Sequence, residues 1–191
     1  MKRRLFVAVD LPDVVKARFN NFFEKTKDII EVKWEKEQKI HLTLAFLGFV
    51  EEERVPSLLL LLKKIGKKQK PFHLLVSPKV EGFPTLSNPR VVWLPIIGDV
   101  DSLKQVTDKL RGRLRENNFD FDDRDFVPHL TLGRFRSGVK KWQKEKIVQQ
   151  IKDLLFPNSL PFKVKGITLY KSQPVREGSF YTKLFYEDFG Y

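Results

Sequence analysis

The clearest alternation of polar and apolar positions occurs twice, about half a chain apart, at residues 41–44 and at residues 129–132. Both segments read His-Leu-Thr-Leu. In a β-strand successive side chains point to opposite faces, so the His and the Thr of each segment share one face while both Leu residues face the core. Each segment therefore predicts a strand that offers an imidazole and a hydroxyl side by side.

The surrounding pattern predicts the same order of elements in each half: a strand, a helix, the motif strand, a second helix and a closing strand. In the first half these fall at residues 4–10, 11–28, 41–49, 51–68 and 72–80, and in the second at 91–97, 101–117, 126–135, 140–155 and 160–172, with one more strand at 178–187 after a turn at 173–178. This repetition predicts an α+β fold of two lobes related by a pseudo-twofold axis. Each lobe would carry an antiparallel sheet and helices, and the motif strands would line the cleft between them.

We expect one domain over residues 1–191, with lobes at about 1–88 and 89–191; the sequence leaves open an exchange of terminal strands between the lobes. An apolar content of 41% with 13% aromatic residues is typical of a folded globular protein. No apolar run is long enough to cross a bilayer and no signal peptide is recognisable, so we expect a cytoplasmic protein without a membrane partner. The absence of cysteine excludes disulfides, thiol nucleophiles and Cys-ligated zinc. The absence of cysteine, a single Met and many Lys and Glu residues are together typical of a thermophilic protein.

A net charge of +12 indicates an anionic partner. Nucleic acid is the first candidate, because clustered Lys and Arg gain affinity by releasing counterions from phosphates. The alternative is that runs such as residues 63–70 are only solvated helix surface. The sequence does not decide between the two.

The paired histidines indicate catalysis. A single His on a strand is most often a partly buried polar residue, and His73, which has no Thr two residues later, is interpreted in this way. Two imidazoles on either side of a cleft would instead supply a general acid and a general base near neutral pH. Neither motif has a third ligand at a spacing suited to zinc, and residues 120–125 lack the Gly and the Glu of a calcium loop. We therefore expect no metal and no other cofactor; a glycine-rich triphosphate-binding loop is also missing.

The tandem motifs resemble those of the 2H phosphoesterases, and in particular the RNA 2′,3′-cyclic phosphodiesterases, also called 2′-5′ RNA ligases. The resemblance covers nearly the whole chain: residues 4–12, Trp34 with residues 41–48, residues 88–94, residues 126–134, and the closing hairpin with Tyr170, Lys171, Ser172 and Tyr181. The family more often has Ala where Gly133 stands, which the sequence suggests is of little consequence. The implied fold is the bilobal α+β arrangement already predicted.

The resemblance implies that His41 donates a proton to the leaving ribose oxygen and that His129 accepts one from water; the sequence alone does not assign these roles. Thr43 and Thr131 are expected to donate hydrogen bonds to the phosphate oxygens. Arg134 would face away from His129 in a regular strand, so it reaches the phosphate only if the strand bends near Gly133. Candidates for stacking on bases, with core packing as the alternative use, are Phe46, Phe83, Tyr181 and Trp34.

The expected function is metal-independent hydrolysis of RNA 2′,3′-cyclic phosphate ends to a 2′-phosphomonoester, with ATP-independent 2′-5′ ligation as the reverse reaction. The expected partner is RNA with such ends, tRNA halves among them, and the protein is expected to act as a monomer. Two alternatives stay open: a non-catalytic RNA-binding protein, and a cyclic phosphodiesterase that acts on a small nucleotide.

Overall fold

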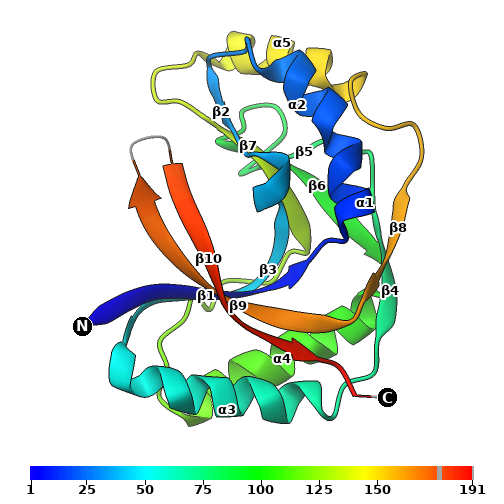
Figure 1. Cartoon of the computed structure of the whole chain (residues 1–191). Coiled ribbons are helices and arrows are strands. Elements are labelled where there is room, and N and C mark those ends of the chain that lie inside the picture. The colour runs from blue at the N-terminus through cyan, green and yellow to red at the C-terminus, as the bar shows by residue number, and fades with distance from the viewer. Residues whose placement is uncertain (176–177, 191) are drawn as a thin grey trace.

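The strands form two antiparallel sheets in this computed structural model, which describes residues 1–175 and 178–190 (Figure 1). The four-stranded sheet has the order β10-β9-β1-β3, with β1 at Lys2–Asp10, β3 at His41–Glu51, β9 at Gly166–Val175 and β10 at Gly178–Asp188. The other has the order β2-β7-β6-β4-β8 with β5 paired to β6, and comprises β2 (Val32–Trp34), β4 (Phe72–Val76), β5 (Glu81–Phe83), β6 (Val91–Gly98), β7 (His129–Phe135) and β8 (Leu160–Val164). Each sheet therefore combines strands from both halves of the chain.

The helices cover the outer sides of the two sheets. They are α1 (Asp13–Lys16), α2 (Asn20–Thr26), α3 (Val55–Gly66), α4 (Val100–Glu116) and α5 (Lys141–Lys152). Both α3 and α4 pack against the four-stranded sheet, whereas α1, α2 and α5 lie beside the other sheet (Figure 1). The i, i+3/i+4 spacing predicted for α4 is confirmed, since Leu103, Val106, Leu110 and Leu114 are all fully buried. None of the helices in the described part of the chain is long and apolar enough to cross a membrane.

The α+β fold predicted from the sequence is thus confirmed, and the two motif strands occupy matching positions. In the β1–β3 pair, His41 lies opposite the last residue of β1, Asp10. In the β6–β7 pair, His129 lies opposite Pro95 near the end of β6. Both histidines are partly exposed, and the Leu residues that follow them are buried, as the alternation predicts. The two motif strands contact one another, which brings their polar faces together.

Each motif strand contains a β-bulge three residues after its histidine. The pairing shifts so that Leu44 has no partner on β1 and Leu132 has no partner on β6. An unpaired extra residue reverses the alternation of the residues beyond it. As a result, the next exposed side chains, Phe46 and Arg134, return to the side of the strand that carries the histidine. This is the bend that Arg134 needs in order to reach the cleft.

Several predicted boundaries were wrong. The helix predicted at residues 11–28 is interrupted by a short 3-10 helix at Ala17–Phe19. The second motif strand begins at His129 itself, and the strand predicted at residues 160–172 is divided between the two sheets. The short strands β2 and β5 were not predicted. The predicted turn at 173–178 includes residues 176 and 177, which lie outside the described residues.

Candidate active site

The two motif histidines are held by the same kind of hydrogen bond. His41 Nδ1 lies 2.6 Å from the carbonyl oxygen of Lys39, and His129 Nδ1 lies 2.7 Å from the carbonyl oxygen of Val127. A carbonyl oxygen can only accept, so Nδ1 carries the proton in both rings. In the neutral state each Nε2 therefore keeps a lone pair, and in the protonated state it has a proton to give.

Aromatic rings surround each imidazole. The His41 ring lies 4.8 Å from the ring of Phe6 and 5.3 Å from that of Tyr181, between centroids. The His129 ring lies 5.2 Å from the ring of Phe83 and 5.5 Å from that of Trp93. Burial among these rings lowers the pKa of His41 to about 4 and also lowers the pKa of His129.

The fixed charges nearest the two imidazoles differ in sign. Beyond the dominant effect of burial, the carboxylate of Asp10 raises the pKa of His41, whereas Lys16 and the charged form of His129 lower it. The neighbouring charge at His129 is the Arg134 guanidinium, which lowers the pKa of that imidazole. One negative and two positive groups therefore act on the pKa of His41, with the negative Asp10 the strongest of the three, and one positive group acts on that of His129.

Asp10 is a residue that the sequence reasoning missed. Its carboxylate accepts hydrogen bonds from the Tyr170 hydroxyl, from Thr168 Oγ1 at 2.8 Å and from Lys183 Nζ at 2.6 Å. Burial alone would raise the pKa of Asp10, but these three donors together hold it below its ordinary value. Asp10 is therefore ionised at neutral pH, opposite His41. The only sequence signal was its place at the end of the strand that precedes the first motif.

A cavity of about 720 Å³ lies beside His129 and contains most of the predicted site residues. Its lining includes His129, Thr43, Thr131, Arg134, Phe46 and Phe83. Both motif strands thus contribute a hydroxyl to the same space, and Arg134 lies with them because of the bulge at Leu132. The bend that the sequence required for Arg134 is therefore present.

A second cavity, of about 370 Å³, is lined by Phe6 and Tyr181, the rings that pack against His41, whereas His41 itself lines neither cavity. Phe46 and Arg134 line both cavities, so the two cavities are adjacent at these side chains. Tyr181 lies in this second cavity, together with Phe6 and Trp34. Trp34 is also anchored to the fold, since its Nε1 donates to the carbonyl oxygen of Ile29 at 3.3 Å and its ring packs edge-on against Phe22.

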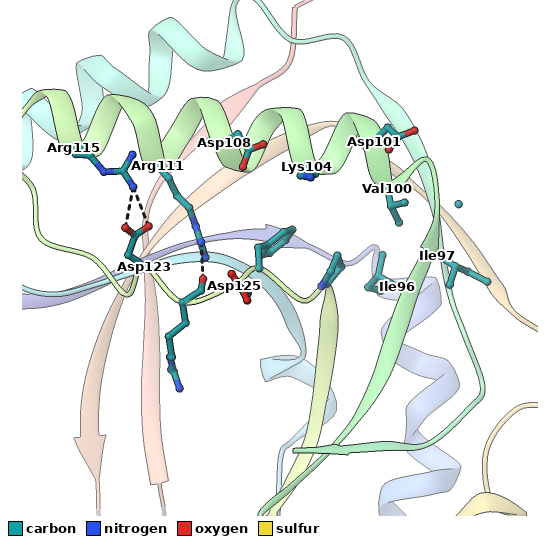
Figure 2. A pocket seen from close by; sticks show the side chains of 14 residues that line it. Ile96, Ile97, Val100, Asp101, Lys104, Asp108, Arg111, Arg115, Asp123 and Asp125 are labelled. Carbon is teal, nitrogen blue, oxygen red and sulfur yellow. Dashed lines mark hydrogen bonds and ion pairs between the residues drawn. The ribbon is translucent and has the colours of Figure 1, made fainter. Parts of the chain in front are cut away.

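The segment that leads into His129 is fastened to α4. Arg115 donates to both carboxylate oxygens of Asp123 at 3.0 Å (Figure 2). Arg111 donates to the carbonyl oxygen of Arg124 at 2.8 Å. On its other side, the backbone N–H of Asp122 donates to the carbonyl oxygen of Phe46 at 2.9 Å. Residues 122–124 therefore connect α4 to the first motif strand just before the second motif begins.

Gly133 is more constrained than the sequence suggested. A Cβ at this position would lie 2.7 Å from Val32 Cγ1 and 2.8 Å from Trp34 Cε3, on the neighbouring strand β2. These atoms belong to short or rigid side chains of a paired strand, so they have little room to move. In this chain an alanine at 133 would not be the neutral change that was expected, because β2 packs directly over the glycine.

No cluster of three or more His, Cys, Asp or Glu side chains suited to hold a metal ion occurs within residues 1–175 and 178–190. His73, interpreted as an ordinary strand residue, is exposed on β4 opposite Lys163, outside both cavities.

Comparisons with known proteins agree with this geometry. The sequence model of the 2′-5′ RNA ligase superfamily matches residues 30–176. An RNA 2′,3′-cyclic phosphodiesterase of Thermotoga maritima is 31% identical, over 96% of this chain and 94% of the relative. One from Methanocaldococcus jannaschii is 30% identical, over 93% and 96%.

Solved structures give the same result. A Thermus thermophilus protein superimposes with a TM-score of 0.78 at 26% identity, over 97% of both chains. Escherichia coli LigT complexed with 3′-AMP superimposes with a TM-score of 0.76 at 27% identity, over 99% of both chains. The fold, the paired motifs and the family match all coincide, and this chain belongs to the 2′-5′ RNA ligase superfamily.

Proposed function

We propose that this protein hydrolyses RNA 2′,3′-cyclic phosphate ends to 2′-phosphomonoesters without a metal ion. The observation that carries the proposal is the matched pair of imidazoles, each with Nδ1 bound to a carbonyl oxygen and Nε2 left for proton transfer. The relatives named RNA 2′,3′-cyclic phosphodiesterase support this substrate. Two proton-transfer groups are sufficient for the reaction, since it needs one base for water and one acid for the leaving oxygen.

In the proposed reaction His129 Nε2 takes a proton from water as the water oxygen attacks phosphorus. The bond between phosphorus and the ribose 3′-oxygen breaks, and His41 Nε2 gives its proton to that oxygen. The product is a 2′-phosphate and a 3′-hydroxyl, and both histidines return to their starting states by exchange with solvent. Thr43 and Thr131 donate to the non-bridging oxygens, and Arg134 offsets their negative charge.

The charges beside the two rings support this assignment of acid and base. Burial lowers the pKa of both histidines, and lowers that of His41 to about 4. Burial by itself would thus make His41 the poorer proton carrier. A bound phosphate adds negative charge to the same space and favours the protonated form of both rings. Asp10 then favours the proton on His41 against the weaker opposing effect of Lys16, while Arg134 disfavours a proton on His129, and this difference supports the proposed roles.

In 2′-5′ ligation an RNA 5′-hydroxyl takes the place of water. His129 Nε2 takes its proton as the 5′-oxygen attacks phosphorus, the bond to the 3′-oxygen breaks, and His41 Nε2 protonates that oxygen. Hydrolysis dominates in dilute RNA because water is the abundant nucleophile. We propose RNA ends such as those of tRNA halves as substrates and a monomer as the acting form. The cytoplasm is the expected location. A non-catalytic RNA-binding role would not require two imidazoles with this shared geometry.

The test is an RNA oligomer with a 2′,3′-cyclic phosphate end, incubated with the protein in EDTA, with the product ends mapped. We expect a 2′-phosphate product and a rate that chelator does not change. His41→Ala and His129→Ala should each remove most of the turnover while circular dichroism and RNA affinity stay close to those of the unmodified protein. Binding without turnover by the unmodified protein would contradict the proposal.

A further inference from the structure

The two cavities that meet at Phe46 and Arg134 differ in charge. Within the described residues, the cavity beside His129 has Arg111, Arg124 and Arg134 set against Asp122, Asp123 and Asp125. The second cavity, bordered by Phe6 and Tyr181, contains the cations Arg4, Lys33, Lys36, Lys39 and Arg134 and the single carboxylate of Glu35. Of these two cavities, the second has the strong excess of positive charge.

Most of these cations are available to a ligand. Lys39 donates to the carbonyl oxygen of Ser179 at 2.7 Å, so it is engaged with the β9–β10 hairpin. The exposed side chains of Arg4, Lys33 and Lys36 have no ion pair or hydrogen bond to any other described residue. Like charges that outnumber their single carboxylate repel each other, and an anion bound between them reduces that repulsion.

Glu35 marks a different kind of contact in the same cavity. Its carboxylate is partly buried, and burial raises its pKa against the opposing effect of Arg134, Lys39 and Lys33. Glu35 forms no hydrogen bond or ion pair through its side chain within the described residues. A carboxylate would repel phosphate, so it is suited to a part of the ligand that donates hydrogen bonds, such as the edge of a base. The rings of Phe46 and Tyr181 border the same space and can stack on a base.

The proposed reaction gives this cavity a place along the substrate. With His41 beside the leaving 3′-oxygen, the ribose and the RNA strand attached to it lie toward the second cavity, whose Phe6 and Tyr181 rings pack against His41. We propose that the cavity of Arg4, Lys33, Lys36 and Glu35 is a subsite for the RNA strand on the 5′ side of the cyclic phosphate, with cations on its phosphodiesters and Glu35 on a base. This inference rests on the proposed function, and it makes an oligonucleotide rather than a mononucleotide the preferred substrate.

The test compares a 2′,3′-cyclic mononucleotide with a trinucleotide that has the same cyclic end. We expect the unmodified protein to have the higher kcat/KM on the trinucleotide. The double variant Lys33→Ala/Lys36→Ala should reduce the ratio of the two kcat/KM values by about tenfold. It should also reduce the salt dependence of trinucleotide binding, the slope of log K against log [salt], by about 1.4, the value expected for two lost contacts to single-stranded phosphates.

The matched control is Lys67→Ala/Lys68→Ala, which removes the same charge at the end of α3, outside both cavities. This control should change neither the ratio nor the slope. An equal loss of ratio in both double variants would show that only net charge matters and would overturn the subsite. An unchanged ratio in Lys33→Ala/Lys36→Ala would overturn it as well.

Glu35→Gln tests the base contact, because an amide donates as well as accepts. We expect the kcat/KM values of trinucleotides that differ in their bases to become more similar to one another. Unchanged differences among these values would contradict the contact. The failures of the two proposals can be told apart. No turnover of either substrate by the unmodified protein refutes the proposed function, whereas turnover without a preference for the longer substrate refutes only the subsite.

Discussion

Replacing Asp10 with Asn tests the assignment of the catalytic proton. Asp10 and His41 are directly opposed in the β1–β3 pair, so their side chains lie on the same face of the sheet. Asn keeps the shape of Asp and can still accept a hydrogen bond, but it removes the negative charge. The change should lower the pKa of His41, because the charged imidazole loses a favourable neighbour.

The size of the effect follows from the separation of the charges. Opposed cross-strand residues have Cβ atoms about 5 Å apart, which places the two charges roughly 6 Å apart. With an effective dielectric constant of about 20, a pair at that distance interacts by about 2.8 kcal/mol, or about two pH units. The ammonium of Lys183, 2.6 Å from the Asp10 carboxylate, cancels part of this field. The Asp10 side chain is also 20% exposed, so solvent weakens the interaction between the two charges further. The expected decrease in the pKa of His41 is therefore about one pH unit.

The assay is kcat/KM on a cyclic-phosphate substrate across pH. At a pH above both histidine pKa values, nearly all His129 is neutral. The fraction of enzyme that is active is then the fraction in which His41 is still protonated. Asp10→Asn should therefore lower this alkaline limb by about tenfold. At pH below both pKa values, the rate depends on how much His129 is neutral, so the acid limb should stay unchanged. This division of the two limbs holds whichever pKa is the higher.

The control is Lys183→Met, which removes the charge that opposes Asp10. It should raise the alkaline limb several-fold, opposite in direction to Asp10→Asn, whereas general damage to the site would lower both limbs in both variants. If His41 were instead the base, Asp10→Asn would raise the acid limb. That result, or an equal loss on both limbs, would refute the reasoning.

Three further predictions follow from individual contacts. Thr43→Ala and Thr131→Ala should each cost about 1–3 kcal/mol of transition-state stabilisation through a lost hydrogen bond to charged oxygen, measured as kcat/KM, and an effect on KM alone would contradict this. Gly133→Ala should lower the free energy of unfolding by about 1–3 kcal/mol by overpacking against β2, and Tm by about 2–4 °C for each kcal/mol, so an unchanged Tm would show that β2 yields freely. Arg115→Ala should reduce kcat more than Arg115→Lys, which retains one contact to Asp123, and equal effects of the two would argue against a positioning role.

The fold and the motif faces were accessible from the sequence because they depend on local periodicity. Leu at every second position forces His and Thr to the other face of a strand, wherever that strand lies. In the same way the spacing of Leu103, Val106 and Leu110 predicts the buried face of α4. The repeated motif then made two histidines the natural candidates for the site. These features need only the neighbours of each residue along the chain.

Other features arise only when distant segments meet. The bulges at Leu44 and Leu132 are properties of strand pairing, and they decide that Phe46 and Arg134 face the cleft. Asp10 gains its role from Tyr170, Thr168 and Lys183, which lie more than 150 residues away in the sequence.

The cation-rich cavity likewise combines Arg4 of β1, the Lys33–Lys36 region and Arg134 of β7, none of which shares a pattern in the sequence. Strand alternation specifies which way a side chain points relative to its own strand. Pairing and packing specify which other charges it then meets. The sequence by itself therefore determined the catalytic residues to propose, while the tertiary structure decided which charges lie beside each of them.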